Sequence, residues 1–210
     1  MISFTILLLA LSVAATSMDP LDAALASYQQ VVSYRVTLHS RSDASSEIIR
    51  YFFKRPGFVR MEFIEPHKGA VLVYNPEKKE AKLRPFGLVK SLVFSLSPDS
   101  RLITSSRGHR VDASDIGALL ATVKKLRGKG KSETLRNEIA EGKKTILVTV
   151  EGEGAVTVAD NVHTYLLWLS AETFLPVRTT TYDASGTLVE EVVMTDLEIN
   201  IDLPDSLFEL

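Results

Sequence analysis

Cysteine is absent from the 210-residue sequence, and its absence excludes several kinds of site. Without thiols the chain has no thiolate zinc site, iron–sulfur cluster, cysteine nucleophile or disulfide bond. An anchor on a lipidated N-terminal cysteine is excluded for the same reason. With 45% hydrophobic and 24% charged residues, the chain is nevertheless typical of a folded globular protein that can bury a sizeable core.

An excess of charge of either sign is also missing. The 24 basic and 26 acidic side chains give a formal net charge of −2, with both signs spread along the chain. This balance provides no electrostatic footprint for nucleic acid or for anionic lipid headgroups. No nucleic-acid partner is therefore expected.

Long apolar runs are confined to the N-terminus. Residues 4–15 (FTILLLALSVAA) form an uncharged run of about the length of a secretory h-region, and small residues follow it. The run is shorter than the roughly 18–20 residues that span a bilayer, so a signal peptide is favoured over a membrane anchor. We expect residues 1–17 to be removed, by cleavage after Ala15 or Ser17, and residues 18–210 to form one soluble domain in an exported compartment.

Two amphipathic helices are predicted. The first covers residues 19–32, with Asp19 as N-cap and Pro20 at the first helical position. Its buried face is expected to comprise Leu21, Ala24, Leu25, Tyr28 and Val32. The second covers residues 112–126, with Asp112 or Ser114 as N-cap and Gly128 as its stop. Its apolar face is expected to comprise Ile116, Leu119, Leu120, Val123 and Leu126.

Elsewhere the apolar period is two, which indicates β-strands. Expected strands, joined by polar turns, cover residues 34–38, 47–54, 58–64, 70–74, 132–140, 145–151, 164–170, 177–183 and 187–199. Residues 86–96 are compatible with either a strand or a helix. Consecutive strands without helices between them indicate an antiparallel sheet. We expect an α+β fold, in which one curled antiparallel sheet of about ten or eleven strands has the helices on its concave face.

No catalytic or metal-binding motif is found. The histidines His39, His67, His109 and His163 are far apart, with no H-x-x-H or H-E-x-x-H spacing. A G-x-S-x-G elbow is missing, although a triad assembled in space from Ser, His and Asp stays open. Residues 130–132 (GKS) lack the earlier glycine of a phosphate-binding loop. We expect no enzyme activity, no catalytic residue, no metal and no cofactor.

Apolar side chains on both faces of neighbouring strands are the most distinctive feature. Counting by two places Tyr51, Phe53 and Arg55 on one face of their strand and Phe52 on the other. Two interpretations stay open: ordinary core packing beneath the helices, or a sheet covered loosely enough to leave an apolar cavity. The expected wall of such a cavity comprises Tyr51, Phe53, Val59, Met61, Phe63, Leu72, Tyr74, Ile116, Leu119, Leu120 and Val123.

Four stretches, in order, carry a resemblance to a known family: FFKRPGFVRMEF (52–63), VYNP (73–76), LPVRTTTYDASGTLVEE (175–191) and NIDLPDSLF (200–208). With the exported N-terminus, they resemble the periplasmic lipoprotein carriers LolA and LolB. The resemblance implies a highly curved sheet, an unclosed β-barrel, with helices as a lid over an apolar cavity for acyl chains. By position, Arg55 matches the arginine that fastens the lid, and residues 114–126 match a lid helix.

Departures from the carrier pattern indicate a divergent branch. Phe52 and Met61 stand where the carriers have tryptophan, and residues 106–112 match no carrier motif. The resemblance implies a monomeric periplasmic carrier for lipid or lipoprotein, without catalysis, whose partners are acyl chains and a membrane-bound donor or acceptor protein. The alternative is a periplasmic sensor or scaffold, like the related RseB, that binds a protein partner through the same sheet.

Overall fold

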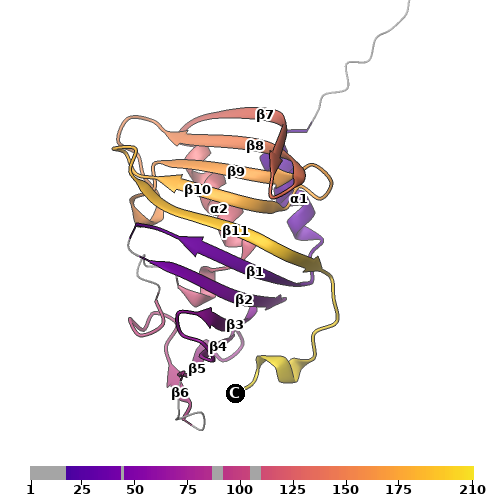
Figure 1. Cartoon of the computed structure of the whole chain (residues 1–210), viewed down its shortest axis with the longest axis vertical. Helices are drawn as coiled ribbons and strands as arrows, with labels where there is room; N and C mark the ends of the chain where they lie inside the picture. The colour runs from indigo at the N-terminus through magenta and orange to yellow at the C-terminus, as the bar shows by residue number, and fades with distance from the viewer. Residues whose placement is uncertain (1–17, 44, 87–91, 105–109) are drawn as a thin grey trace, which may run out of the picture.

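The computed structural model describes residues 18–43, 45–86, 92–104 and 110–210. Its centre is one sheet of eleven strands in the order β6-β5-β4-β3-β2-β1-β11-β10-β9-β8-β7, and all neighbours are antiparallel (Figure 1). The strands are β1 Ser33–Arg41, β2 Ser46–Lys54, β3 Phe58–Glu65, β4 Val71–Asn75, β5 Glu80–Arg84, β6 Phe94–Leu96, β7 Gly130–Ala140, β8 Lys143–Gly152, β9 Thr164–Ser170, β10 Pro176–Tyr182 and β11 Leu188–Ile199.

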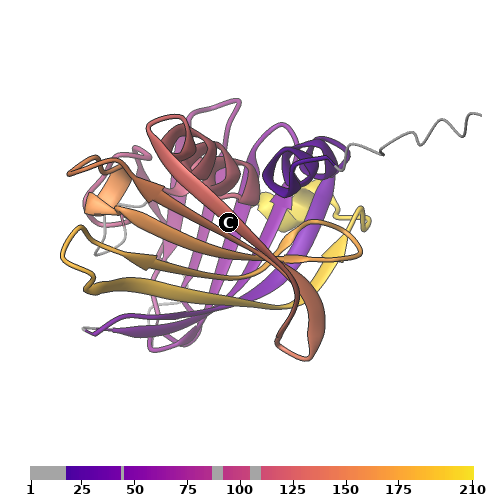
Figure 2. The same ribbon diagram turned by 90° about the horizontal axis from the view of Figure 1, so that it is seen from above.

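The sheet curves around two helices, α1 Pro20–Gln29 and α2 Ile116–Arg127. Figure 2 shows both of them on the concave side. Because β6 and β7 stand at opposite ends of the strand order and do not pair, the barrel is unclosed. The expected fold class, a curved antiparallel sheet with helices over its concave face, is confirmed. In the described residues, no helix combines the length and the apolar character that a membrane crossing requires.

The first helix begins where the sequence predicts and ends earlier. The Asp19 carboxylate accepts hydrogen bonds from the backbone N–H groups of Leu21 and Asp22, so its role as N-cap is confirmed. The expected end at residue 32 is wrong, because α1 stops at Gln29 and the chain turns into β1. Val32, expected on the buried face, is 58% exposed.

The second helix has a different N-cap from either expected residue. Asp115 is the cap, and its carboxylate accepts from the N–H groups of Gly117 and Ala118 at 2.7 and 3.2 Å. Asp112 lies in a 3-10 turn, Val111–Ala113, where Arg110 holds its carboxylate, and the Ser114 hydroxyl donates to the Val111 carbonyl. Both are therefore occupied elsewhere. Gly128 is the C-cap, as predicted.

One short strand, β5, was absent from the sequence prediction, and another, β6, lies in the range that the sequence left open. β5 carries only two apolar residues, Ala81 and Leu83, between charged ones, so the backbone hydrogen bonds to β4 define it more than its pattern does. The described part of residues 86–96 contains β6, which settles that open alternative as a strand at its end. Residues 87–91 and the expected signal peptide, residues 1–17, lie outside the described residues.

Two apolar clusters hold the fold together. The larger fills the space between the helices and the concave face, and its fully buried members include Leu21, Leu120, Leu126, Leu167 and Leu169. The smaller lies on the convex face, where the C-terminal segment after β11 covers β2 and β4. Its buried members are Phe52, Val71, Val73, Leu203 and Phe208. Both faces of the β2–β4 region are thus covered, which explains its aromatics on alternate sides.

Candidate functional site

An apolar cavity of about 730 Å³ lies between the concave face of the sheet and α2 with the segment that precedes it. Strands β1 to β5 and β9 to β11 form its floor, and α2 contributes four residues, Ile116, Ala118, Leu119 and Thr122. The volume is within the range of about 300–1,000 Å³ that small-molecule sites occupy. The fold therefore contains a site large enough for a ligand of that size.

The floor consists of side chains that the strand register places directly opposite one another. One row runs Val36, Tyr51, Met61, Leu72 and Leu83 across β1 to β5. A parallel row runs Leu38, Ile49 and Phe63 across β1 to β3. Because side chains of one strand alternate between faces, the register of the sheet alone produces this continuous apolar surface.

Six of the eleven residues expected on the cavity wall line this cavity: Tyr51, Met61, Phe63, Leu72, Ile116 and Leu119. The structure places the other five in the buried core beside it: Phe53, Val59, Tyr74, Leu120 and Val123. The first three of these form the next row of the sheet, Phe53 opposite Val59 and Val59 opposite Tyr74, where aromatic rings and α1 fill the space. Leu120 and Val123 belong to the half of α2 that packs on β7 and β8.

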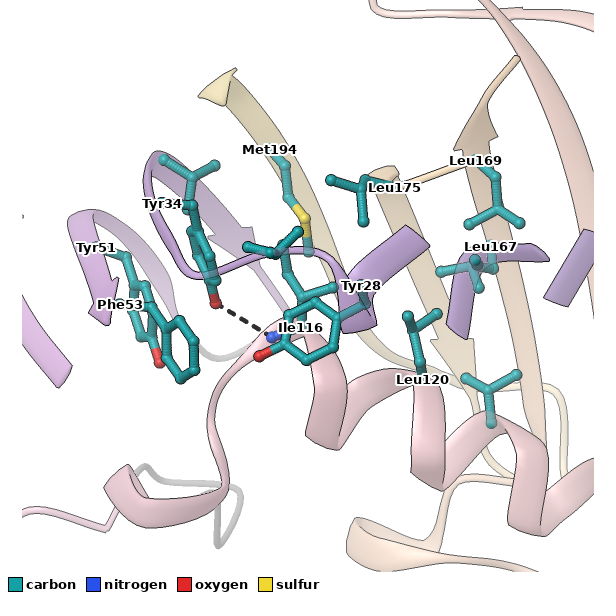
Figure 3. Packing of buried hydrophobic residues seen from close by; sticks show 14 of the residues in the cluster. Tyr28, Tyr34, Tyr51, Phe53, Ile116, Leu120, Leu167, Leu169, Leu175 and Met194 are labelled. Atoms are coloured by element: carbon teal, nitrogen blue, oxygen red, sulfur yellow. Dashed lines mark hydrogen bonds between the residues drawn. The ribbon is translucent and has the colours of Figure 1, made fainter. Parts of the chain in front are cut away.

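An aromatic cluster closes one end of the cavity. The Tyr34 ring stacks on the rings of Tyr51 and Phe53, with centroids 5.8 and 5.2 Å away, and Tyr28 of α1 meets Phe53 at 6.2 Å. Figure 3 shows these rings beside the start of α2, with Leu120, Leu167 and Leu169 beyond them. Phe53 therefore serves the packing between α1 and the sheet.

The three tyrosine hydroxyls of this cluster all reach the N-terminal end of α2. Tyr28 donates to the Asp115 carboxylate at 2.6 Å, and the Tyr51 hydroxyl lies 3.0 Å from that of Ser114. The Tyr34 hydroxyl accepts from the backbone N–H of Ile116 at 3.2 Å, the bond drawn in Figure 3. Burial is the main cause that raises the pKa of each tyrosine well above its ordinary value. The hydroxyls thus stay protonated and able to donate.

Arg55, expected as a lid latch, binds the end of α1. Its Nε donates to the Val31 carbonyl at 2.6 Å and its Nη2 to the Tyr28 carbonyl at 3.0 Å. The guanidinium carbon also lies 5.4 Å from the centroid of the Tyr28 ring. A cation at a helix C-terminus satisfies carbonyls that have no partner within the helix. Arg55 therefore joins the end of β2 to α1, while the aromatic cluster joins the sheet to α2.

Ion pairs join the N-terminal end of α1 to the C-terminal end of α2. Arg127, in the last turn of α2, binds Asp19 at 2.5 Å and Asp22 at 3.1 Å, and Lys124 reaches Asp22 at 3.4 Å. Although partial burial opposes it, hydrogen bonding to Arg127 lowers the pKa of Asp22 below its usual value. The acidic start of α1 and the basic end of α2 match the dipole of each helix. The helices therefore form one connected cover.

The cavity ends in polar groups that sequence reasoning missed. Ser40, Glu47, Thr179, Thr181 and Glu190 line it where β1, β2, β10 and β11 approach their turns, and the Ser40 hydroxyl donates to Glu190. The alternation that identified the apolar face continues through these strands, so Ser40 and Glu47 share the face of Val36 and Tyr51. That signal was available in the sequence. The residues supplied by β10 and β11 required knowledge of which strand lies beside β1.

Chemistry-bearing groups do not gather in the described part of the chain. No group of three or more His, Asp or Glu is arranged there to hold a metal ion. Of the described histidines, His163 contacts the Val156 carbonyl, His67 stacks on Phe86, and His39 lies 3.2 Å from the Thr195 hydroxyl. The arrangement provides an apolar cavity, a hydrogen-bonded cover and a polar end.

An unclosed antiparallel barrel with helices over an apolar cavity is the architecture implied by the resemblance to LolA and LolB, and this divergent version of that fold is confirmed. The chain belongs to the family described as "Protein of unknown function (DUF1571)", which it matches over residues 25–210. No curated protein matches the sequence.

Solved structures of similar fold include an uncharacterized conserved protein from Thermus thermophilus, with a TM-score of 0.57, 10% identity and 91% of each chain covered. A chain of the Pseudomonas aeruginosa MucA/MucB complex matches with a TM-score of 0.57 and 13% identity, over 91% of this chain and 59% of that chain. Mycobacterium tuberculosis lipoprotein LppX matches at 0.50 and 12% identity, over 88% and 95%. This chain thus spans about three fifths of the MucA/MucB match. These likenesses concern the fold.

Proposed function

We propose that this protein is a periplasmic carrier that binds a lipid or an acylated protein and shields the acyl chains in its cavity, without catalysis. The observation that carries the proposal is the cavity of about 730 Å³, whose floor is a continuous apolar surface and whose cover is α2. Each buried methylene contributes about 0.8 kcal/mol, so a long acyl chain contributes roughly 10 kcal/mol before the costs of ordering. Affinity then needs no specific headgroup.

Export is part of this proposal. An acyl-chain carrier acts between membranes, and the apolar run at residues 4–15 has the form of a signal peptide. Residues 18–210 are proposed as the mature domain. Mass spectrometry of the protein from its native host should find its N-terminus between about Ala15 and Asp19. An intact Met1 on a cytoplasmic protein would contradict this.

Binding is tested by native mass spectrometry after gentle extraction, followed by titration with a fluorescent fatty-acid probe. Phe63 lines the cavity, and Phe63→Asp places a carboxylate that the ligand must desolvate, so probe affinity should fall at least about tenfold. Ile64, the next residue of β3, does not line the cavity and is also half-buried, which makes Ile64→Asp the matched control. If both variants fold and bind the probe with equal affinity, the cavity is not where the probe binds.

A second candidate is a periplasmic sensor or scaffold that binds a protein partner through the same sheet. One observation favours it: the likeness in fold to a chain of the MucA/MucB complex, in which two proteins are bound together. The same extraction experiment separates the candidates, because a carrier retains lipid and a sensor retains protein. Retention of a protein partner with no lipid, together with no probe binding, would favour the sensor.

A further inference from the structure

A row of apolar side chains leads from the cavity to one open edge of the sheet. On the concave face Tyr51 lies opposite Met61, then Leu72, then Leu83, and Leu83 lies opposite Phe94 on the edge strand β6. Tyr51 and Leu72 are 1% and 3% exposed, whereas Phe94 at the edge of the sheet is 43% exposed. The row therefore joins the cavity floor to solvent without crossing a polar residue.

Exposed apolar side chains gather at this edge. Phe86 and Leu102 line the cavity and are 55% and 75% exposed, so the cavity reaches the surface here. Leu92, Val93 and Phe94, at the start of β6, are exposed as well. These five residues, named the mouth patch, are half of the ten large hydrophobic residues exposed within the described ranges. Figure 1 shows β5 and β6 at the end of the sheet opposite β7.

The segments beside the mouth patch carry a small positive charge, although the whole chain does not. Residues 80–86 and 92–104 contain three basic side chains, Lys82, Arg84 and Arg101, and two acidic ones, Glu80 and Asp99. Their local charge is 3 − 2 = +1, and Lys82 and Arg84 lie on the convex face of β5, opposite Val73 and Val71. Arg101 is exposed and directly precedes Leu102. An exposed arginine beside exposed apolar side chains is complementary to a layer of anionic headgroups over hydrocarbon.

The edge is a poor site for an added strand. β6 has three residues, and a very short edge strand offers few free backbone groups for pairing with another chain. The opposite edge, β7, has eleven residues and is the longer template. Large exposed aliphatic and aromatic side chains beside the exposed Arg101 instead favour insertion at the interface of a bilayer.

We propose that the mouth patch docks onto a phospholipid bilayer and that acyl chains pass between bilayer and cavity along the row from Phe94 to Tyr51. That an acyl chain is the transferred ligand rests on the proposed function, whereas docking onto a bilayer requires no ligand in the cavity. Insertion of Phe86, Phe94 and Leu102 below the headgroups places the cavity opening at the depth of the acyl chains. A transferred chain then stays out of water throughout.

The test measures binding to vesicles of phosphatidylcholine alone and of phosphatidylcholine with phosphatidylglycerol. A chain of residues 18–210 contains every described helix and strand and omits the apolar run at residues 4–15. The triple variant Phe86→Asp, Phe94→Asp, Leu102→Asp should bind at least about tenfold more weakly, because these side chains supply the apolar burial. The matched control is Leu135→Asp, Ile139→Asp, two exposed apolar residues of β7, and it should bind as wild type does.

Charge is tested separately with Arg101→Gln. Binding to the anionic vesicles should fall about fivefold, and binding to the neutral vesicles should stay unchanged. Near-UV circular dichroism verifies the fold of each variant. The proposal is overturned if wild type binds neither vesicle, or if the mouth-patch and β7 variants bind equally.

Probe titration without vesicles keeps the two proposals apart. If wild type binds the acyl probe but no vesicle, docking fails and the proposed function stands. If wild type binds vesicles through the mouth patch but takes up no probe, docking stands and the carrier function fails.

Discussion

The Tyr34 hydroxyl accepts a hydrogen bond of 3.2 Å from the backbone N–H of Ile116, across 82 residues of sequence. Tyr34 lies near the start of β1, and Ile116 is the first residue of α2. The first N–H groups of a helix have no partner within it, so this buried bond satisfies a group that burial would otherwise penalise. The bond also determines where α2 begins above the sheet. Because both residues line the cavity, the lid position and the cavity shape depend on the same contact.

Tyr34→Phe should destabilise the fold by about 1–3 kcal/mol, because it leaves the Ile116 N–H unsatisfied while the ring packing is retained. Urea unfolding measures the loss, and hydrogen exchange should accelerate at the first turn of α2. Tyr74→Phe is the matched control, since Tyr74 is also buried on the concave face and its hydroxyl makes no hydrogen bond within the described residues. Equal losses in the two variants would show that the Tyr34 bond does not hold the helix.

Gly117→Ala should destabilise the protein even though alanine favours helices. A Cβ at Gly117 would lie 2.2 Å from Cε1 of Tyr28 and 2.8 Å from the Asp115 carboxylate, so the Tyr28 ring must move from its place beside Asp115 and Phe53. The expected cost is about 1–3 kcal/mol. Gly128→Ala, whose Cβ meets only ordinary contacts at 3.6 Å, should be neutral or slightly stabilising in the same urea titration. A stabilised Gly117→Ala would mean that Tyr28 does not rest on this turn.

Acid should weaken the joint between the two helices. The pKa of Asp22 is lowered in the folded state, so the unfolded chain binds its proton first as pH falls. The contribution of the Asp22–Arg127 pair is therefore complete above the ordinary value of 3.8 and is lost as pH falls through the lowered pKa. Because the Asp22 side chain is 44% exposed, the ion pair contributes only about 0–1 kcal/mol to the free energy of unfolding.

Asp22→Asn should accordingly lower the urea midpoint at pH 7, and the difference from wild type should shrink as the pH falls through the lowered pKa of Asp22. High salt should shrink the difference at pH 7, because exposed pairs are screened. A difference between the two proteins that is as large in acid as at neutral pH would exclude the ion pair as its cause.

The sequence predicted the faces of the strands and the class of fold, because alternation and turn residues are local properties. Met61, Phe63 and Leu72 followed from that alternation and line the cavity. Phe53 and Val59 share the same face, yet they lie in the packed core. The difference between filled and empty space under one sheet face depends on where α1 crosses it, and no local pattern encodes that position.

The cap of α2 illustrates the same limit at a smaller scale. Asp112, Ser114 and Asp115 are all good N-cap residues by type. The choice among them depends on partners distant in sequence, since Tyr28 and Tyr34 bind only at Asp115 and Ile116. Hydrogen bonds to residues distant in sequence therefore determine which of the three residues caps α2.

Arg55→Leu tests whether the hold on α1 opposes ligand uptake. In the structure the guanidinium donates to the carbonyl of Tyr28 in α1 and to that of Val31 just after the helix, and the backbone N–H of Arg55 donates to the Val32 carbonyl. The side-chain bonds stabilise the arrangement in which α1 covers the sheet, and a ligand that needs α1 to move must compete with them. Removal should increase the population that is competent to bind and so increase the apparent affinity for the acyl probe.

Transfer should respond in the opposite sense. Re-formation of the bonds to Val31 and Tyr28 favours the closed, empty protein, so Arg55→Leu loses part of the free energy that expels the ligand. The variant should load readily and release a labelled acyl chain to acceptor vesicles several-fold more slowly than wild type does. Arg60→Leu is the matched control, because Arg60 also donates to a main-chain carbonyl, that of Leu207, on the convex face. If Arg55→Leu and Arg60→Leu release the chain at the wild-type rate, Arg55 fixes α1 in place but does not regulate the cavity.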